Sequence, residues 1–237
     1  MNHTQSPIIL ALDTDDLDVA KSWIEATAPA IDVFKVGLEF FLNFGSAGIN
    51  ELKNAGDFEL FLDLKLHDIP NTVAGAVRGI KELSPKFLTV HAAGGSAMIQ
   101  SAADEAGPTK ITAVTVLTSL NQSDLTSMGI ELTPLDYAQS LALNAVNAGA
   151  EAIVCSPHEV AAIRSIVPAE INLITPGVRP EGSALGDQAR VMTPSTAIAA
   201  GSDYLVVGRP ITSLYDGSEA STKKMGAKAQ EILDSIG

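Results

Sequence analysis

Residues 58–72 read FELFLDLKLHDIPNT and contain the change of pattern that decides the fold. Phe58–Lys65 is a largely apolar run of strand length, and Pro70 marks the first turn of a helix a few residues later. Strands that are buried on both faces read as nearly continuous apolar runs, as in parallel sheets. This stretch therefore predicts a buried strand that leads through a polar junction into a helix.

The same pattern recurs along the whole chain. Seven further apolar runs predict strands, at Ile8–Asp13, Asp32–Gly37, Phe87–His91, Ile111–Leu117, Ala152–Ser156, Asn172–Gly177 and Tyr204–Gly208. Longer amphipathic segments between them have helix caps: Asp15 or Asp16 before Leu17–Ala28, Thr133 with Pro134 before Leu135–Ala148, and Ser156 with Pro157 before His158–Val167. Gly56, Gly149 and Gly201 stand where helices are expected to end.

Eight alternating strands and helices predict an α/β fold of the (β/α)8 or TIM-barrel type, which typically takes about 250 residues. An open, doubly wound sheet is the structural competitor. It is disfavoured because the first strand is followed by Leu-Asp-Thr-Asp at 12–15 rather than by a glycine-rich phosphate loop. Without a linker or a shift of composition, residues 1–237 are expected to form one domain.

The composition excludes several classes of function. The net charge of −13 predicts a surface that repels nucleic acid and anionic membranes. No apolar run approaches the roughly 20 residues of a membrane span, and Met1–Ser6 lacks the features of a signal peptide. The single cysteine, Cys155, cannot form an internal disulfide and is expected to be a small buried residue. These observations predict a cytoplasmic protein.

Active sites of (β/α)8 barrels lie at the carboxyl ends of the strands. These ends, in chain order, carry Asp13, Lys35, Asp63 with Lys65, His91, Thr118, Ser156, Gly177, and Gly208 with Arg209. Any one of these charged groups, taken alone, can be interpreted as part of a capped turn or a structural ion pair, and for Asp13 this interpretation is as good as a functional one. Several of them at neighbouring strand ends indicate a functional site.

The densest cluster follows Phe61 in the opening stretch. Asp63 and Lys65 are two residues apart on a strand, so both are expected on the interior face of the barrel, with Leu62, Leu64 and Leu66 on the opposite face. Asp68 follows the strand, and Thr72 lies in the first turn of the next helix, where capping is its commoner use. Carboxylates around Lys65 keep its amine protonated, so the array predicts a positioned ammonium donor.

Residues 63–72, DLKLHDIPNT, resemble the signature of the orotidine 5'-phosphate decarboxylases. The resemblance covers essentially the whole chain. It continues in ALD at 11–13, FKVG at 34–37, LTS at 117–119, TPGVR at 175–179 and VGRPIT at 207–212. It implies an enzyme that converts orotidine 5'-phosphate to UMP and CO2, without metal or organic cofactor, as a homodimer.

The resemblance also implies roles for individual residues. Lys65 would protonate the substrate carbon within a network completed by Lys35, Asp63 and by Asp68 of the neighbouring subunit. Asp13 and Lys35 would bind the ribose hydroxyls, and Thr118 or Ser119 the pyrimidine. Gly208 and Arg209 would hold the phosphate, with Arg179 and Gln188 assisting and Thr72 reaching in from the partner.

The phosphate site has support independent of the resemblance, because these barrels commonly bind phosphate at the loops after the seventh and eighth strands. Gly177 and Arg179 follow the seventh predicted strand, and Gly208 and Arg209 the eighth. The segment between Arg179 and Met192, with Gly182, Gly186 and Gln188, is interpreted as a lid or, alternatively, as a long surface loop.

Two other functions remain open at this stage. His67 and His91 could bind a metal with Asp63 and Asp68, which would suit a metal-dependent lyase or epimerase of sugar phosphates, although such histidines are more often structural. The chain could also be a nucleotide-binding barrel without turnover. Full activity after exhaustive treatment with EDTA would exclude the metal-dependent enzyme. Absence of UMP formation would support the nucleotide-binding barrel.

Overall fold

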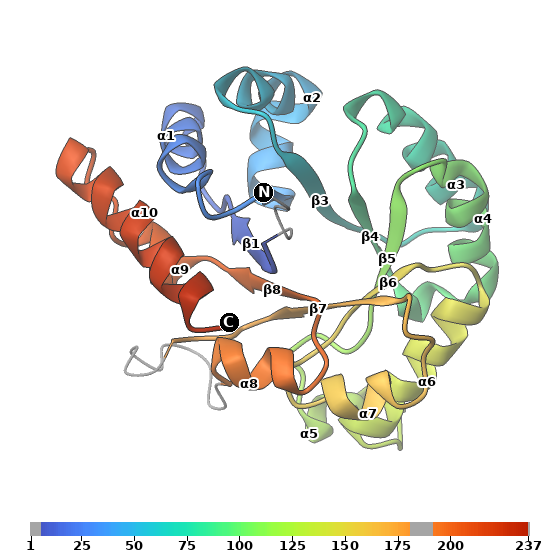
Figure 1. The fold of residues 1–237 in the computed structure, drawn as a ribbon. Helices are drawn as coiled ribbons and strands as arrows, with labels where there is room; N and C mark the ends of the chain where they lie inside the picture. Colours follow the sequence, from blue (N-terminus) through green and yellow to red (C-terminus); the bar gives the residue numbers. More distant parts are fainter. Residues whose placement is uncertain (1–5, 181–191, 237) are drawn as a thin grey trace.

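The computed structural model of the chain describes residues 6–180 and 192–236. In this part, eight parallel strands follow one another in chain order and close into a barrel, with β8 beside β1 (Figure 1). The strands are β1 (Ile8–Ala11), β2 (Val33–Gly37), β3 (Glu59–Leu66), β4 (Phe87–His91), β5 (Lys110–Val114), β6 (Ala152–Val154), β7 (Asn172–Pro176) and β8 (Tyr204–Val207). The predicted (β/α)8 barrel is confirmed.

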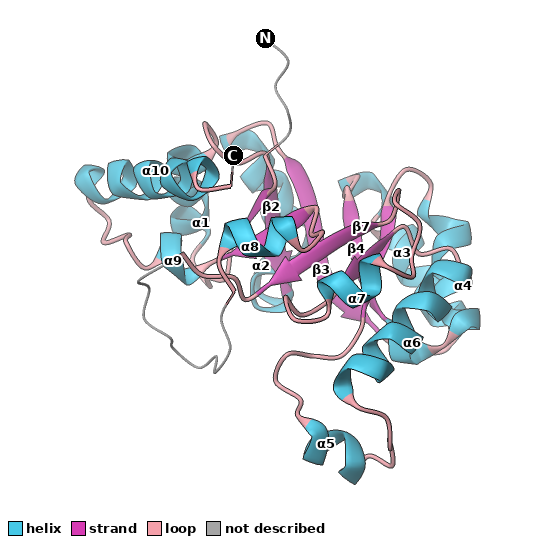
Figure 2. Ribbon diagram, turned by 60° about the horizontal axis from the view of Figure 1, so that its bottom comes forward, coloured by secondary structure: helices cyan, strands magenta, loops and turns pink. Residues whose placement is uncertain are grey.

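Helices surround the strands on the outside of the barrel (Figures 1 and 2). They are α1 (Leu17–Thr27), α2 (Leu38–Ala55), α3 (Pro70–Gly79), α4 (Ser96–Ala106), α5 (Gln122–Ser127), α6 (Pro134–Asn147), α7 (Val160–Arg164), α8 (Pro194–Ala199), α9 (Arg209–Thr212) and α10 (Glu219–Asp234), with 3-10 turns η1 (Lys81–Leu83) and η2 (Ala92–Gly94). Among the described residues, no helix combines the length and apolar character that a membrane crossing requires.

Two of the predicted helix starts are confirmed by their caps. The Asp16 side chain accepts hydrogen bonds from the backbone N–H groups of Asp18 and Val19 at the start of α1. Thr133 caps α6 in the same way, and Pro134 occupies the first turn, where its missing N–H is no loss. Side-chain caps of this kind contribute about 1 kcal/mol each.

The helix after β6 corrects the sequence-based expectation. It begins at Val160 rather than at His158, because Ser156–Glu159 form a separate turn first. Gly149 and Gly201 have the positive φ angles of 93° and 112° expected after a helix. Gly56 also ends a helix, but its φ of 177° is extended backbone that any residue can adopt.

The interior of the barrel is packed rather than hollow. Its buried residues include Phe61 and Phe87, whose rings lie edge to face with centroids 5.6 Å apart. The other members of this buried cluster are Ile9, Val33, Ala152 and Ile174. Because Phe61 precedes Asp63 by two residues on β3, this apolar layer forms a floor beneath the charged residues at the strand ends.

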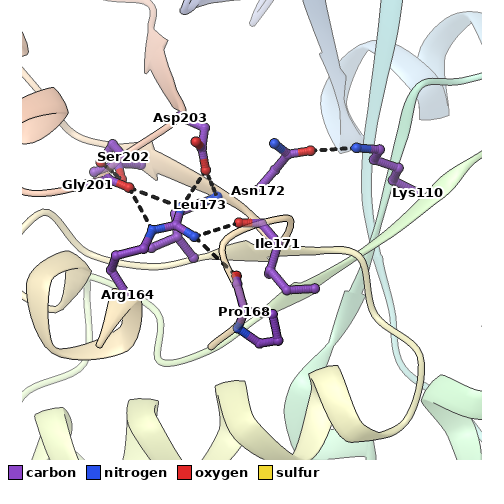
Figure 3. A network of polar contacts seen from close by, with 10 residues as sticks. Lys110, Arg164, Pro168, Ile171, Asn172, Leu173, Gly201, Ser202 and Asp203 are labelled. Carbon is purple, nitrogen blue, oxygen red and sulfur yellow. Dashed lines mark hydrogen bonds and ion pairs between the residues drawn. The ribbon is translucent and has the colours of Figure 1, made fainter. Parts of the chain in front are cut away.

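A polar network at the amino ends of β7 and β8 joins α7 to the barrel (Figure 3). The Arg164 guanidinium donates hydrogen bonds to the backbone carbonyls of Gly201, Pro168 and Ile171 and forms an ion pair with Asp203. The Asp203 carboxylate also accepts a hydrogen bond from the backbone N–H of Leu173 at 2.7 Å. This network lies at the end of the barrel opposite the predicted site and is structural.

Candidate active site

Four charged side chains form a continuous chain of ion pairs at the carboxyl ends of β1, β2 and β3. Lys35 Nζ lies 3.1 Å from Asp13 Oδ1 and 3.5 Å from Asp63 Oδ2. Lys65 Nζ lies 2.8 Å from Asp63 Oδ1. Lys35 and Asp63 are both buried, at 9% exposure each, whereas the Asp13 side chain is 63% exposed. The structure thus brings together four residues that the sequence placed at three separate strand ends.

The contact between Asp63 and Lys65 was predicted from regular strand alternation, and that premise is wrong. The pairing of β3 with β4 shifts register between Leu62 and Leu66, and Lys65 has a left-handed φ of 50°. For a residue with a side chain, such a conformation costs of order 1 kcal/mol and persists only where the surroundings enforce it. A bulge, rather than the strand pleat, therefore directs the Lys65 amine to Asp63.

Thr89 on β4 enforces this bulge, and sequence reasoning missed it. The Lys65 backbone N–H donates to Thr89 Oγ1 at 2.8 Å, and the Thr89 hydroxyl donates to Asp63 Oδ1 at 3.0 Å. Thr89 is fully buried. The signal was available, since a threonine stands two residues after the interior Phe87, between the apolar residues Leu88 and Val90.

Asp63 is held as a carboxylate by its neighbours. Burial alone would raise the pKa of Asp63, but the Lys35 and Lys65 ammoniums and the hydrogen bonds from Lys65 and Thr89 outweigh it and leave this pKa below its usual value. The Asp63 carboxylate lies between the two lysine amines, 3.5 Å from Lys35 Nζ and 2.8 Å from Lys65 Nζ. The arrangement is a fixed ammonium with a compensating anion, and it can supply a proton to an adjacent base.

A cavity of about 210 Å³ lies beside this array, and Lys35, Asp63 and Lys65 line it. Thr118, Cys155 and Ser156 line it as well, together with apolar side chains from β5, β6 and β8. It meets a larger groove of about 760 Å³ that is lined by Ser119 and Gly177. Of the two predicted pyrimidine contacts, Thr118 lines the cavity together with the lysines, whereas Ser119 lines the adjoining groove.

Asp68 and Thr72 do not reach this cavity within the chain. Both side chains are exposed near the start of α3, and Asp68 Oδ1 accepts a hydrogen bond from the adjacent Ile69 backbone N–H. Among the ion pairs between described residues, none joins Asp68 to Lys65. Their assignment to a neighbouring subunit stays a prediction.

The predicted phosphate residues lie at the ends of β7 and β8. Gly208 precedes α9, and Arg209 is the first residue of that helix. Arg179 follows β7, and its buried Nε has no hydrogen-bond partner within residues 6–180 and 192–236. Gln188, Gly182 and Gly186 lie outside the described residues, and so does most of the predicted lid.

The histidines of the metal-dependent alternative pack against each other, with ring centroids 5.4 Å apart for His67 and His91. Burial, with further contributions from His67 and Lys65, lowers the pKa of His91 and favours its neutral form. Within the described ranges, no three His, Cys, Asp or Glu side chains are grouped so that they could hold a metal ion. Asp63, the central ligand of that alternative, is engaged by two lysines instead.

Comparison with known proteins agrees with the resemblance inferred from residues 63–72. The sequence model of the orotidine 5'-phosphate decarboxylase / HUMPS family matches residues 6–223. The chain belongs to this family. Among its members, the orotidine 5'-phosphate decarboxylase of Thermobifida fusca (strain YX) is 52% identical over 216 residues, which cover 91% of this chain and 93% of that relative. The enzyme of the same name from Escherichia coli O6:K15:H31 (strain 536 / UPEC) is 42% identical over 96% of this chain and 94% of the relative.

Solved structures of other proteins share the fold. The crystal structure of orotidine 5'-phosphate decarboxylase from Lactobacillus acidophilus superposes with a TM-score of 0.80 at 34% identity, covering 97% of this chain and all of the other. An uncharacterized conserved protein from Geobacillus kaustophilus gives a TM-score of 0.77 at 31% identity. The predicted family resemblance is therefore confirmed.

Proposed function

We propose that this chain decarboxylates orotidine 5'-phosphate to UMP and CO2 in pyrimidine biosynthesis. The observation that carries the proposal is the chain of ion pairs Asp13–Lys35–Asp63–Lys65 beside a cavity, in a member of a family whose matched relatives bear the name of this activity. Consistent with the acidic surface and single cysteine, we propose the cytoplasm as its location, with no nucleic-acid or membrane partner.

In the proposed complex the pyrimidine occupies the cavity between the lysines and Thr118, with Ser119 at its rim. The ribose hydroxyls meet Asp13 and Lys35, whose ion pair offers both an acceptor and a donor. Lys65 then faces the ring carbon that carries the carboxylate. Positioning of this kind is worth several kcal/mol when the reacting atoms are held in line.

The reaction breaks the bond between the ring carbon and the carboxylate. The electron pair stays on the ring carbon, in the ring plane and outside the π system, while CO2 departs. A proton then passes from the Lys65 ammonium to this carbon, which leaves a neutral amine. No electron sink is required, so we propose that no metal or organic cofactor takes part.

The Lys65 charge stabilises the transition state before it gives up its proton. At about 4 Å and an effective dielectric near 20, an ammonium contributes about 4 kcal/mol. Enzymes commonly supply roughly 8–23 kcal/mol, so this interaction is only part of the total. Asp63, held ionised, faces the departing carboxylate, and repulsion between the two anions would favour loss of CO2.

Binding of the distant phosphate supplies a further part. Gly208 and Arg209 at the end of β8, with Arg179 after β7, are proposed to hold it, and Gln188 to assist. The buried Arg179 Nε, which lacks a partner in the described part of the chain, would gain an acceptor from a phosphate oxygen. Such remote contacts raise the rate when they enforce orientation at the reacting carbon.

We further propose a homodimer in which Asp68 and Thr72 complete the partner's site. Their exposure near the start of α3 and the 66% exposure of Ile69 between them support an interface at this position. Asp68 would then become the second carboxylate beside the neighbouring Lys65. The Lys65 ammonium would then be attracted by two opposite charges and held in position between them.

The decisive experiment is to dialyse the purified protein exhaustively against EDTA, add orotidine 5'-phosphate and follow UMP formation. We expect full activity, equal to that of undialysed protein. UMP formation that disappears and returns with a divalent cation would contradict the proposed metal-free reaction, and turnover of a sugar phosphate instead of orotidine 5'-phosphate would support the metal-dependent alternative. Nucleotide binding without any UMP would support a barrel that has no turnover.

A further inference from the structure

The turn after β6 contains a buried carboxyl group that the proposed reaction does not use. The side chain of Glu159 is only 8% exposed, although it belongs to one of the residue types least often buried. Burial raises the pKa of Glu159 to about 7, against a hydrogen bond from the Ser156 backbone that lowers it. Because burying such a group costs free energy, its position calls for a compensating role.

Glu159 closes the turn through two hydrogen bonds with Ser156, one that it accepts and one that it donates. The Ser156 backbone N–H donates to Glu159 Oε2 at 3.0 Å, and the Glu159 backbone N–H donates to the Ser156 carbonyl at 2.9 Å. The side chain therefore helps to hold the Ser156 backbone in place. An exposed cap would serve the short helix α7 equally well, so helix formation alone does not explain the burial.

Ser156 is part of the wall of the reaction cavity. It lines both the cavity that contains Lys65 and the larger groove that meets it. In the closed barrel, β6 lies four strands from β2 and three from β3, so the turn after β6 faces Lys35 and Lys65 across the opening. A planar ring in this cavity would lie between the lysines on one side and the Ser156 turn on the other.

We propose that Glu159 is a positioning residue: its carboxyl group holds the Ser156 turn as the wall that sets the pyrimidine ring against Lys65. The inference rests on the proposed function, since it concerns the same substrate. Displacement of reacting groups by about 1 Å can cost about 100-fold in rate. The phosphate and ribose contacts remain, so the loss belongs mainly to kcat rather than to KM.

The test compares Glu159→Ala with Glu159→Gln, which keeps an oxygen acceptor for the Ser156 N–H. Turnover of orotidine 5'-phosphate is measured well below the unfolding temperature, and amide hydrogen exchange of residues 155–159 is followed by mass spectrometry. Glu170→Ala is the matched control, because Glu170 is exposed in the loop before β7. We expect Glu159→Ala to lower kcat at least 10-fold, to change KM less than 3-fold and to speed exchange at Ser156, with Glu159→Gln near the wild type.

Each other outcome overturns the inference. A wild-type kcat in Glu159→Ala, with or without faster exchange, removes the positioning role while leaving the proposed function intact. Equal losses in the alanine and glutamine variants would show that the acceptor is not what matters. Absence of UMP formation by the wild type refutes the proposed function and this inference together. If Glu159→Ala does not fold, Glu159→Asp, which shortens the side chain by one methylene, is expected to lower kcat in the same direction, and a wild-type kcat there counts against the inference.

Discussion

The amine of Lys65 is the group on which the proposed chemistry depends. It lies 2.8 Å from Asp63 and lines the cavity, as a proton donor to bound substrate requires. Lys65→Ala should lower kcat by about 100-fold or more, because both the fixed charge and the proton source are lost. Affinity for UMP, measured by calorimetry, should change much less.

Lys81→Ala is the control for this substitution, since Lys81 forms an exposed ion pair with Glu105 away from the cavity. It should retain wild-type kinetics. If Lys65→Ala kept a tenth of the wild-type rate, its role as proton donor would be refuted.

The raised pKa of Glu159 has a consequence for stability. The group ionises near 4.5 in the unfolded chain and near 7 in the folded protein, so between these values the folded state holds a proton that the unfolded state has lost. The free energy of unfolding therefore falls as pH rises through this window. Relative to Glu159→Gln, the wild type should lose about 2 kcal/mol between pH 5.5 and pH 8. Urea denaturation at both pH values measures the difference, and parallel profiles would contradict the assignment.

At the scale of elements, the bulge in β3 depends on its neighbour β4. Thr89→Val keeps the shape of the side chain but leaves the Lys65 backbone N–H without its acceptor and Asp63 without one donor. We expect a loss of about 1–3 kcal/mol in unfolding free energy and a fall in kcat of roughly 10-fold. Thr112→Val on β5 removes a buried hydroxyl that, among the described residues, donates within its own strand to the Lys110 carbonyl. Thr112→Val should reduce stability without reducing kcat. An equal loss of kcat in both variants would show that the loss in Thr89→Val does not come from the bulge.

At the junction of α7 with β7 and β8, a substitution should lower stability and leave turnover unchanged. Arg164→Ala removes hydrogen bonds to three backbone carbonyls and the ion pair with Asp203 (Figure 3). The cost should be about 1–3 kcal/mol of unfolding free energy, because partly buried acceptors at Gly201, Ile171 and Asp203 lose their donor. Turnover at 25 °C should be unchanged, since the network lies at the amino ends of the strands. Thermal denaturation and steady-state assays on the same preparation decide this.

At the scale of the whole molecule, the single chain leaves Lys65 with one carboxylate partner among the described residues. If Asp68 completes the partner's site, mixed dimers of inactive Lys65→Ala and inactive Asp68→Ala subunits contain one intact site. Random mixing in equal amounts makes half of the dimers mixed, so about a quarter of the wild-type activity should return. Mixing Lys65→Ala with the double variant is the control and should restore nothing. Proven mixed dimers without activity would place Asp68 outside the shared site.

Local patterns in the sequence were sufficient to predict the fold. Eight apolar runs predicted eight strands within a few residues of their observed ends. Each run alone indicates a strand that is buried on both faces, because both sets of alternating side chains are apolar. The caps at Asp16 and Thr133 were predictable for the same reason, as each involves residues within one turn. The strand ends also identified Lys35, Asp63 and Lys65 as candidates, since charged groups in apolar strands are costly unless paired or used.

Contacts between distant strands were decided only by the tertiary structure. Thr89 meets Lys65 across 24 residues, and the left-handed Lys65 backbone depends on that contact rather than on its own strand pattern. Glu159 is 8% exposed in the folded barrel, whereas its sequence neighbourhood suggested an ordinary helix start. The physical reason is that hydrophobic periodicity is a property of a short segment, while barrel closure determines which side chains from separate segments share one cavity.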